Sequence, residues 1–516
     1  MAIKEVKPAV SGDPIKHHQP QSAVQQSEIS LPPAAADGVF KVTGQNGFLP
    51  LVPALRQLPS GRYDLLETIM QRIPIALKEA APDALKKEVL AIPESVAEDW
   101  RAAIEVEEDT QLAQAVYRDL SILTAAYITE GRQKENHSRA LVPAVLARPF
   151  YAAAKRVDQQ LIMEYSSYCL NNFYSVDGSE GDWTKLRLIR SFDGGPEEAT
   201  FILIHSIIEH NTPRMIEVIE RVKEAVKAAD VAACEEGLKE LLKVQERLLV
   251  CGLQMFNASD PECYVDKVRP WIFGYKNNPD FPDGVVFDGV LDNQPQFLRG
   301  ETGAQSNIIP VLDALLGIEH AHDALFQMLK ELEDYRPAGH RRYLQDMRRA
   351  MWGDDVSEPR ADVTRAHALR ALVEERGSRE LAATFNECVM AVYLFRAMHV
   401  IYSDLYIGRK TAKEAATGGT PYKVYLRKHR DESIRQQIQK FPDAVFSSPL
   451  PSAEEVAASL DACRSGASEN GIPSILRAIP PFSRMIAEHG RGHPSLKTKM
   501  YPSKEWALSA TDMPCV

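Results

Sequence analysis

The stretch from Arg379 to Gly408 reads RELAATFNECVMAVYLFRAMHVIYSDLYIG, and it decides the fold. Apolar and aromatic residues recur along it at steps of three and four, which predicts one helix roughly 40 Å long. Ser378 can cap the start of this helix, Gly408 can end it, and no proline interrupts it. One position in the apolar stripe is polar, and the residue there is His399.

A neutral imidazole in an apolar stripe needs either a hydrogen-bond partner or a metal ion. The simpler interpretation of His399 is a core histidine bonded to a carbonyl group, and the alternative is a metal ligand. Arg396 lies one turn back on the same side, so a permanent cation borders the stripe. The helix pattern alone leaves both interpretations open.

Composition bounds the class of protein. At 516 residues, the chain is long enough for two or three domains with a large core. Its contents of 45% hydrophobic and 25% charged residues are ordinary globular values. The formal net charge is −11 and no predicted domain has a basic face. We therefore expect no nucleic-acid or membrane partner, and a monomer or a small homo-oligomer.

The cysteines and the N-terminus predict a cytoplasmic protein. The seven cysteines are scattered without any Cys-x-x-Cys spacing, which is typical of reduced thiols. The first residues are polar and contain no apolar core of a signal peptide. We also find no uninterrupted apolar segment of roughly 18 or more residues that could span a bilayer.

Helical spacing recurs throughout and strand signals are sparse, so the predicted fold class is all-α. Residues 1–40 are rich in Gln, Ser, Pro and His and are predicted to form a disordered tail. We expect a small helical domain over residues 41–190, a larger helical domain over 191–440, and a C-terminal extension over 441–516.

Two further helices carry candidate site residues. Residues 158–173 show helical spacing and are predicted to form one of them. Pro196 to Glu209 is predicted to form the other, with proline and two acids in its first turn. Phe201, His205 and Glu209 stand at i, i+4 and i+8 and therefore share one side of that helix. His205 is thus a second histidine within an apolar helix.

Two loops are candidate binding segments. Residues 264–307 are rich in Gly, Pro, Asn and Asp, and so long a connection is uncommon in a helical domain unless it binds something. Residues 416–420 read Ala-Thr-Gly-Gly-Thr, which is typical of a loop that closes over a ligand.

No dinucleotide fingerprint, phosphate-binding loop, zinc-protease motif or nucleophile elbow is present. The positive signal is the pair His205 and His399, each in an apolar helix and far apart in sequence. A helical bundle with a histidine on each side of an apolar pocket can hold a haem, with arginines at its propionates. Two hydrogen-bonded core histidines are the alternative.

Several runs, taken in order, resemble the indoleamine 2,3-dioxygenase family. The similarity extends from about residue 45 to 425, and the combination is more specific than any single run. The runs are Arg299 to Ser306, Leu312 to Ile318, Tyr335 to Arg341, Leu394 to His399, and Thr417 to Thr420.

The resemblance implies an all-α, two-domain enzyme with a small N-terminal helical domain on a larger domain that binds haem b. His399 would be the proximal ligand of the haem iron. Arg396 would lie near the haem edge, paired with Asp313. Gly303 and Ala304 fall in a run that would contact the cofactor.

The resemblance also implies a substrate site. Arg269 matches the arginine that receives the substrate carboxylate, and Phe201 matches the distal aromatic that packs on the substrate ring. Tyr165 and Tyr168 fall where the family lines a deep indole pocket. The matching residues of the closing loop are Thr417, whose side chain would contact the substrate amino group, and Gly418.

Three positions depart from the animal members of the family. His205 stands where those members carry serine and where the related tryptophan 2,3-dioxygenases carry a histidine, so it is a candidate catalytic residue. Tyr264 replaces a pocket phenylalanine, and Tyr168 replaces a smaller residue. These changes leave the implied haem site intact and bear on the identity of the substrate.

The activity implied is that of a dioxygenase, which inserts both atoms of O2 across the indole C2–C3 bond of L-tryptophan or a related indoleamine and gives an N-formylkynurenine-type product. One alternative is a related haem-dependent oxygenase of secondary metabolism acting on a modified tryptophan, as in pyrrolnitrin-type ring rearrangement. A second alternative is a haem-binding sensor or carrier without turnover.

Overall fold

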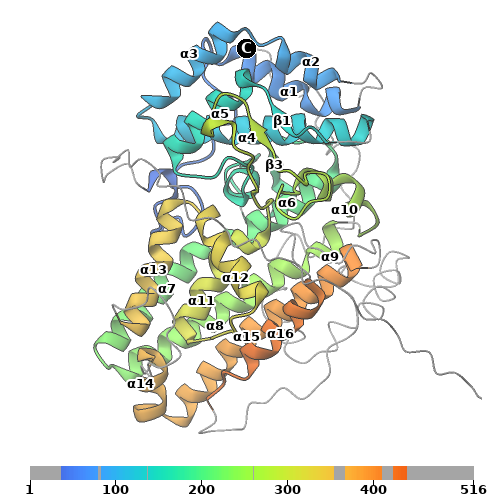
Figure 1. Cartoon of the computed structure of the whole chain (residues 1–516). Helices are drawn as coiled ribbons and strands as arrows, with labels where there is room; N and C mark the ends of the chain where they lie inside the picture. Colours follow the sequence, from blue (N-terminus) through green and yellow to red (C-terminus); the bar gives the residue numbers. More distant parts are fainter. Residues whose placement is uncertain are drawn as a thin grey trace, which may run out of the picture.

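The computed structural model describes residues 37–78, 83–135, 138–179, 181–259, 261–353, 367–408 and 422–438. Within these ranges the protein is built of helices, with only four short strands. The predicted all-α fold class is confirmed. Figure 1 shows the helices gathered into two lobes, with α6 and α10 between them.

The upper lobe in Figure 1 contains the first five long helices, and α5 packs against both α3 and α4. Trp100 and Phe150 are fully buried within it. The helices of this lobe are α1 (Asp64–Lys78), α2 (Ala84–Leu90), α3 (Glu94–Glu105), α4 (Thr110–Glu135) and α5 (Ala144–Val157).

The second part of the chain supplies the lower lobe and the elements between the lobes. In the lower lobe α15 lies beside α8 and α16 (Figure 1). The helices are α6 (Pro196–Glu209), α7 (Thr212–Lys227), α8 (Val231–Leu253), α9 (Met255–Ala258), α10 (Pro261–Lys267), α11 (Ile308–Leu316), α12 (Ala324–Glu331), α13 (Ala338–Trp352), α14 (Ala368–Arg376), α15 (Arg379–Ser403) and α16 (Tyr422–Ile434).

Short 3-10 and π turns, labelled η, connect several of these helices. The π turns are η3 (Ser166–Leu170) and η9 (Asp404–Gly408). The 3-10 turns are η2 (Gly38–Phe40), η4 (Trp183–Lys185), η5 (Arg269–Trp271), η6 (Leu291–Asn293), η7 (Gly303–Gln305) and η8 (Leu332–Tyr335).

The strands of the described residues form two pairs. Strands β1 (Leu141–Val142) and β4 (Val286–Phe287) are parallel, with Leu141 opposite Val286. Strands β2 (Phe173–Ser175) and β3 (Leu186–Leu188) are antiparallel, with Phe173 opposite Leu188. The β1–β4 pair fixes the connection of residues 264–307 to the upper lobe.

Two hydrophobic cores stabilise the molecule. The first runs from Leu66 of α1 through Leu203 of α6 to Met398 of α15, and so it crosses residue 190, our predicted domain boundary. The second joins α7, α8, α11, α13 and α14 to the first half of α15, with Phe385 at 0% exposure. The helix α15 therefore contributes to both cores.

The predicted start of α15 is confirmed, whereas α15 itself ends at Ser403 and the π turn η9 continues it to the predicted end at Gly408. The Ser378 hydroxyl accepts a hydrogen bond from the backbone N–H of Leu381 at 3.0 Å, and η9 ends at Gly408. By length and composition Arg379–Gly408 could cross a bilayer, contrary to our interpretation of the sequence, although 61% of its most apolar window is buried inside the protein. Such burial is typical of a core helix.

The helix predicted over residues 158–173 is wrong. Asp158 adopts a left-handed conformation, with φ of 53°, and it follows the end of α5. The buried Glu164 carboxylate then accepts hydrogen bonds from the backbone N–H of Gln160 at 2.8 Å and from Gln159 Nε2 at 2.5 Å. These bonds hold a loop, and the π turn η3 follows it.

Residues 37–40, which we assigned to the tail, are part of the fold. The turn η2 packs against α4 and α13, and Val39 and Phe40 are buried. The remaining residues of the predicted tail and the C-terminal extension from residue 439 onward lie outside the described residues.

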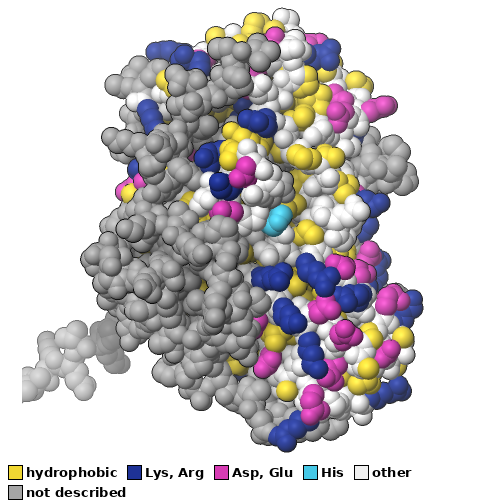
Figure 2. All heavy atoms as spheres, turned by 180° about the vertical axis from the view of Figure 1, so that it is seen from behind, with side chains coloured by type: hydrophobic (Ala, Val, Ile, Leu, Met, Phe, Trp, Pro, Cys, Tyr) yellow, Lys and Arg dark blue, Asp and Glu magenta, His cyan; other side chains and the backbone are white. Residues whose placement is uncertain are grey.

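Figure 2 shows the face opposite to the view of Figure 1. On its described part, positive and negative side chains alternate. Ion pairs on the molecular surface include Arg221 with Glu240 at 2.6 Å and Lys223 with Glu220 at 2.6 Å. Alternating charge of this kind is typical of solvated helix faces.

Candidate functional site

The helix α15 presents His399 at its exposed face. Earlier members of the same stripe, Leu381, Phe385 and Val392, are buried in the second core. His399 is exposed, which corrects our expectation of a buried side chain. The reason is that the second core ends near Val392, and the stripe beyond it faces different neighbours. Among the described residues, the His399 ring has no hydrogen bond.

Protein surrounds the remaining sides of the His399 ring. Lost hydration, together with smaller effects of the nearby His205 and Arg396, lowers the pKa of His399 to about 4. The imidazole is therefore neutral at pH 7 and retains a nitrogen lone pair. A neutral, accessible imidazole of this kind is what a metal ligand requires.

The helix α6 places His205 near this ring, because the charge of His205 influences His399. Its boundaries, Pro196–Glu209, are the predicted ones. His205 Nδ1 lies 2.8 Å from the Phe201 carbonyl oxygen, and since a carbonyl only accepts, Nδ1 carries the proton. Burial lowers the pKa of His205, so Nε2 of the neutral ring is a hydrogen-bond acceptor.

The helix α8 contacts both α6 and α15, the helices that carry His205 and His399. A Cβ on Gly252 would overlap the end of the Met398 side chain and would lie 3.9 Å from Ile208 Cδ1. Met398 belongs to α15 and Ile208 to α6, so the glycine allows both helices to approach one point of α8. The hydroxyl of Tyr402, also on α15, donates to the Gly252 carbonyl.

Aromatic rings surround His205. We call Phe201, Tyr165 and Tyr264, together with His205 and His399, the two-histidine site. The centroid of Phe201 lies 4.7 Å from that of His205 and 5.1 Å from that of Tyr264. The Tyr165 ring meets His205 edge-on at 5.9 Å. The structure thus brings together Phe201, His205, Tyr165 and Tyr264, and their contact with a substrate stays a prediction.

Tyr168 lies in a neighbouring network instead. Its hydroxyl donates to Glu198 Oε1 at 2.9 Å and its ring packs on Phe192 at 5.7 Å. Because Tyr165 precedes η3 and Tyr168 lies within it, the π turn sends the two side chains to different partners. Contact of Tyr168 with a substrate stays a prediction.

Arg269 is buried, with 4% of its surface exposed. Its guanidinium lies over the Phe273 ring at 4.6 Å. Burial raises the pKa of Tyr264, and the positive charge of Arg269 opposes that rise, so Arg269 lies near the two-histidine site. A buried guanidinium beside aromatic rings can receive a carboxylate.

The predicted pairing of Arg396 with Asp313 is confirmed. Arg396 Nη1 and Nη2 donate to Asp313 Oδ1 and Oδ2 at 3.0 and 2.5 Å, and Nη1 also donates to Ser433 Oγ at 2.9 Å. Burial would raise the pKa of Asp313, but Arg396 and His320 outweigh burial and lower it to about 2. This pair fixes the guanidinium one turn from His399.

Gly303 and Ala304 lie on η7, beside α6. A Cβ on Gly303 would stand 3.5 Å from His205 Nε2, so this backbone faces the acceptor nitrogen of that ring. The Ala304 carbonyl accepts a hydrogen bond from Arg336 Nη2 at 3.1 Å. The structure thus places η7 at the two-histidine site, while Thr417 and Gly418 lie outside the described residues.

Sequence reasoning assigned no role to two buried carboxyl groups beside the site. Glu209 Oε1 accepts hydrogen bonds from Ser306 Oγ at 2.6 Å and from the Tyr165 hydroxyl at 3.2 Å, and burial raises its pKa to about 7. Burial likewise raises the pKa of Glu301 to about 8, where Cys169 Sγ is its neighbour at 3.8 Å. The sequence signal that could have identified Glu209 as a site residue is its position one turn after His205.

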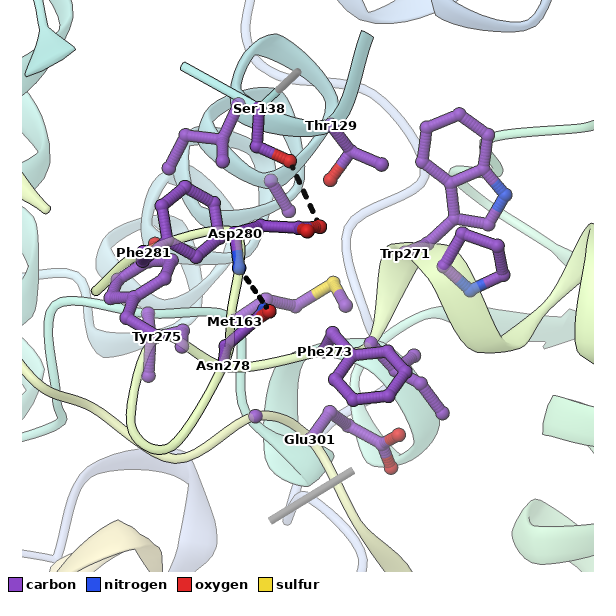
Figure 3. Close-up of a pocket in the computed structure, with 16 residues that line it drawn as sticks. Thr129, Ser138, Met163, Trp271, Phe273, Tyr275, Asn278, Asp280, Phe281 and Glu301 are labelled. Atoms are coloured by element: carbon purple, nitrogen blue, oxygen red, sulfur yellow. Dashed lines mark hydrogen bonds between the residues drawn. The ribbon is translucent and has the colours of Figure 1, made fainter. Parts of the chain in front are cut away.

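A small cavity of about 20 Å³ lies near these residues (Figure 3). It has room for about one water molecule. Its lining includes Thr129 of α4, Trp271 of η5 and Glu301, but neither His205 nor His399. The cavity is therefore separate from the two-histidine site.

Fold and site together define a class of protein. A long core helix presents a neutral, exposed imidazole without a hydrogen bond in the described structure, and a second imidazole lies nearby on another helix. Aromatic rings and two arginines complete the surroundings. This donor set fits a haem, whose iron takes one imidazole. These features define an all-α protein whose site is suited to a haem.

Comparison with known proteins identifies the family. The sequence model of the family described as indoleamine 2,3-dioxygenase matches residues 36–441, so the chain belongs to this family. It is similar to indoleamine 2,3-dioxygenase 1 of Rattus norvegicus, with 26% identity over 365 residues, 67% of this chain and 83% of that protein. The indoleamine 2,3-dioxygenase of Saccharomyces cerevisiae is 25% identical over 450 residues, 77% of this chain and 92% of that protein.

A relative with a different name is also similar. The protein named myoglobin from Haliotis madaka is 23% identical over 342 residues, 64% of this chain and 84% of that protein. Family membership indicates an oxidoreductase of the dioxygenase class, with haem as cofactor and small molecules and O2 as substrates.

Proposed function

We propose that this protein is a cytoplasmic haem b dioxygenase that opens the C2–C3 bond of L-tryptophan or a close indoleamine. One observation carries the proposal: His399 offers a neutral, exposed imidazole beside His205. When bound, the haem supplies the oxygen chemistry, and the protein supplies binding, orientation and electrostatics.

His399 would hold the haem iron. Its low pKa keeps the ring neutral across the physiological range, so no proton competes for the ligating nitrogen. The ion pair of Arg396 with Asp313 would fix a cation near the haem edge, where it can face a propionate. Gly303 and Ala304 would contact the cofactor through the backbone of η7.

Arg269 would orient the substrate through its carboxylate, because a guanidinium offers two parallel donors to the two oxygens. Phe201 and Tyr264 would pack on the indole ring, since their rings already stand 5.1 Å apart beside Arg269. Tyr165 would complete this wall, with its hydroxyl held by Glu209. Together these side chains exclude water from the ring to be opened.

His205 would recognise the indole N–H. Because Nδ1 donates to the Phe201 carbonyl, Nε2 can accept a hydrogen bond but has no proton to give. The neutral ring therefore suits a substrate with a free indole N–H. It suits an N-alkylated indole less well, because that indole leaves the acceptor without a partner.

Product analysis tests this proposal. The reduced holoprotein is incubated with L-tryptophan under air, and the products are identified by mass spectrometry. We expect a product with two added oxygen atoms and the mass of N-formylkynurenine. The Arg269→Leu variant should require a much higher tryptophan concentration, whereas Arg62→Leu, which removes an exposed arginine paired with Asp99, should behave as the wild type. Unchanged tryptophan would contradict the proposal.

An oxygenase of secondary metabolism acting on a modified tryptophan is the first alternative. The observation that favours it is the polar lining, since His205 and Tyr264 bring an imidazole and a phenol to the substrate wall. Incubation with halogenated tryptophans distinguishes the two proposals. A rearranged ring skeleton in the product supports this alternative, and an opened pyrrole ring supports the dioxygenase.

A haem-binding carrier without turnover is the second alternative. The similarity to a protein named myoglobin favours it. Its signature would be stable haem binding with no oxygen consumption for any aromatic amino acid under reducing conditions. Oxygen uptake that depends on an indole substrate would exclude it.

A further inference from the structure

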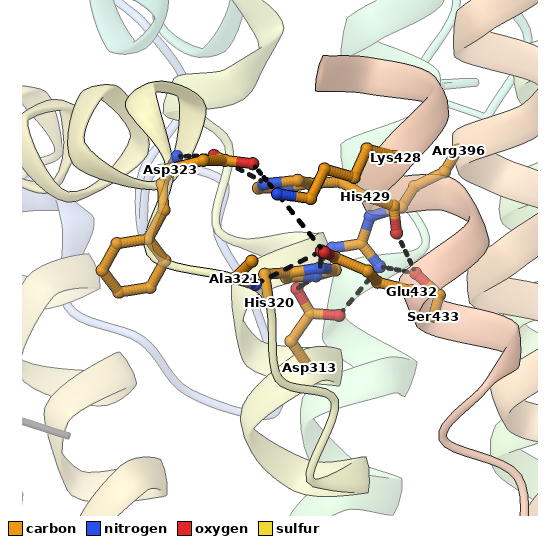
Figure 4. Close-up of polar contacts among 10 residues, drawn as sticks. Asp313, His320, Ala321, Asp323, Arg396, Lys428, His429, Glu432 and Ser433 are labelled. Carbon is orange, nitrogen blue, oxygen red and sulfur yellow. Dashed lines mark hydrogen bonds and ion pairs between the residues drawn. The ribbon is translucent and has the colours of Figure 1, made fainter. Parts of the chain in front are cut away.

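A second histidine cluster lies beside the Asp313–Arg396 pair (Figure 4). His320 follows α11 and His429 lies on α16, and their rings stack face to face with centroids 4.3 Å apart and planes 2° from parallel. Glu432, one turn after His429, accepts at Oε2 from His320 Nδ1 at 3.1 Å. We call His320, His429 and Glu432 the second histidine cluster.

One nitrogen of this cluster is buried without a hydrogen bond. His320 Nε2 has no donor or acceptor in the described structure, and its side chain is 9% exposed. The nearest recorded group is Asp313 Oδ2 at 3.7 Å, which is too long for a hydrogen bond. A ring nitrogen that is buried without a hydrogen bond destabilises the fold unless it gains a proton or binds an ion.

The charges around the cluster favour a cation. Among the residues labelled in Figure 4, Asp313, Asp323 and Glu432 are acidic, whereas only Arg396 and Lys428 are permanently basic. The group therefore carries an excess of one negative charge while both imidazoles are neutral. A divalent cation bound by the cluster would offset this excess.

We propose that His320, His429 and Glu432 bind a divalent transition-metal ion, with Zn²⁺ as the best match. Their three ligand atoms all lie within 4.8 Å of one another. A tetrahedral Zn²⁺ with bonds of about 2.0 Å holds its donors about 3.3 Å apart, so the three side chains must draw together. Imidazole and carboxylate donors are the ones that Zn²⁺ accepts.

The stacked rings must open for binding. A metal ion lies near the plane of each imidazole that ligates it, and two parallel rings do not meet this condition together. The terminal torsion of a histidine side chain is broad, so one ring can turn without leaving a rotamer well. Asp323 or Asp313 can then take the fourth position, because each already contacts one of the two histidines.

Zinc binding is measured on the full-length holoprotein by equilibrium dialysis against Zn²⁺, with the bound metal counted by mass spectrometry. The background carries His17→Ala and His18→Ala, since two adjacent tail histidines can bind metal adventitiously. His320→Asn keeps a donor for Glu432, and His429→Gln keeps a donor for Asp323, so both variants preserve the existing hydrogen bonds. His322→Ala, which removes an exposed histidine two residues away, is the matched control.

We expect one Zn²⁺ per chain in the background and in the control, and a dissociation constant raised at least about tenfold in each of the two cluster variants. Equal binding in all four proteins, or none in the background, would overturn the proposal. If one cluster variant fails to fold, the other decides. X-ray absorption at the zinc edge of the background protein gives an independent result: two imidazole nitrogens at about 2.0 Å support the site, and a sulfur shell overturns it.

Discussion

Replacing Asp313 with Asn tests how strongly the buried ion pair holds α15 to α11. The Asp313 carboxylate receives two hydrogen bonds from Arg396, and the side chains are 16% and 13% exposed. Asparagine keeps the shape but removes the charge. The guanidinium then loses its only recorded anionic partner among the described residues while remaining largely out of water.

The lowered pKa of Asp313 gives the magnitude of its contribution to folding stability. A fall in the pKa of Asp313 from 3.8 to about 2, at about 1.4 kcal/mol per pKa unit, corresponds to about 2 kcal/mol of folding stability. Because the pKa is lowered on folding, this contribution is present above pH 4. It is lost as the pH falls from about 4 to below 2, where the carboxyl is protonated in both states.

The assay is urea unfolding of the wild type and Asp313→Asn between pH 3 and 8, with a metal chelator in the buffer. We expect a loss of about 2 kcal/mol at pH 7 that shrinks below pH 4. Asp346→Asn is the control, because the Asp346–Arg349 pair on α13 is half-exposed and should contribute less than about 0.5 kcal/mol. Equal effects of the two substitutions, or a loss that does not change with pH, would refute the reasoning.

Three further predictions concern the two-histidine site and its loop. His205→Asn keeps the donor to the Phe201 carbonyl and removes the Nε2 acceptor, so the preference for tryptophan over 1-methyltryptophan should fall at least about tenfold in kcat/KM; an unchanged ratio speaks against the indole N–H contact. The carboxyl of Glu209, with a pKa raised to about 7, stays protonated in the fold while the unfolded chain ionises near 4.5. Stability should therefore fall as the pH rises from about 5 to 8, and urea titrations should show a shallower fall for Glu209→Gln. In Gly300→Ala the new Cβ would overlap the Ile272 carbonyl and the Gly274 backbone, so thermal melting should show a loss of at least about 2 kcal/mol in the free energy of unfolding. Gly44→Ala is the control and should change this free energy little, because its Cβ would meet only Glu217 Cβ at 3.8 Å.

The parts of the site that lie on single helices could be predicted from the sequence. Helical spacing, the cap at Ser378 and the proline at Pro196 predicted the start of α15 and both ends of α6, and hence the positions of His399 and His205 along them. Residues 158–173 could not be predicted in this way. Their spacing is helical, but the hydrogen bonds to Glu164 that replace a helix depend on a buried carboxyl, which periodicity does not reveal.

Contacts between distant segments lay beyond pattern reasoning. The pairing of Arg396 with Asp313 was expected only because of the family resemblance. The stack of His320 on His429 joins positions more than 100 residues apart, and neither histidine belongs to a recognisable motif. The exposure of His399 likewise depends on where the second core ends, which is a property of packed helices.

The central claim is that His399 ligates the haem iron, and the most direct test is the haem content of His399→Gly with and without added imidazole. We predict that the wild type and the exposed-histidine variant His322→Ala bind one haem per chain, that His399→Gly loses it, and that imidazole restores both the haem and its absorption spectrum. A full haem content and an unchanged spectrum in His399→Gly without imidazole would contradict the account.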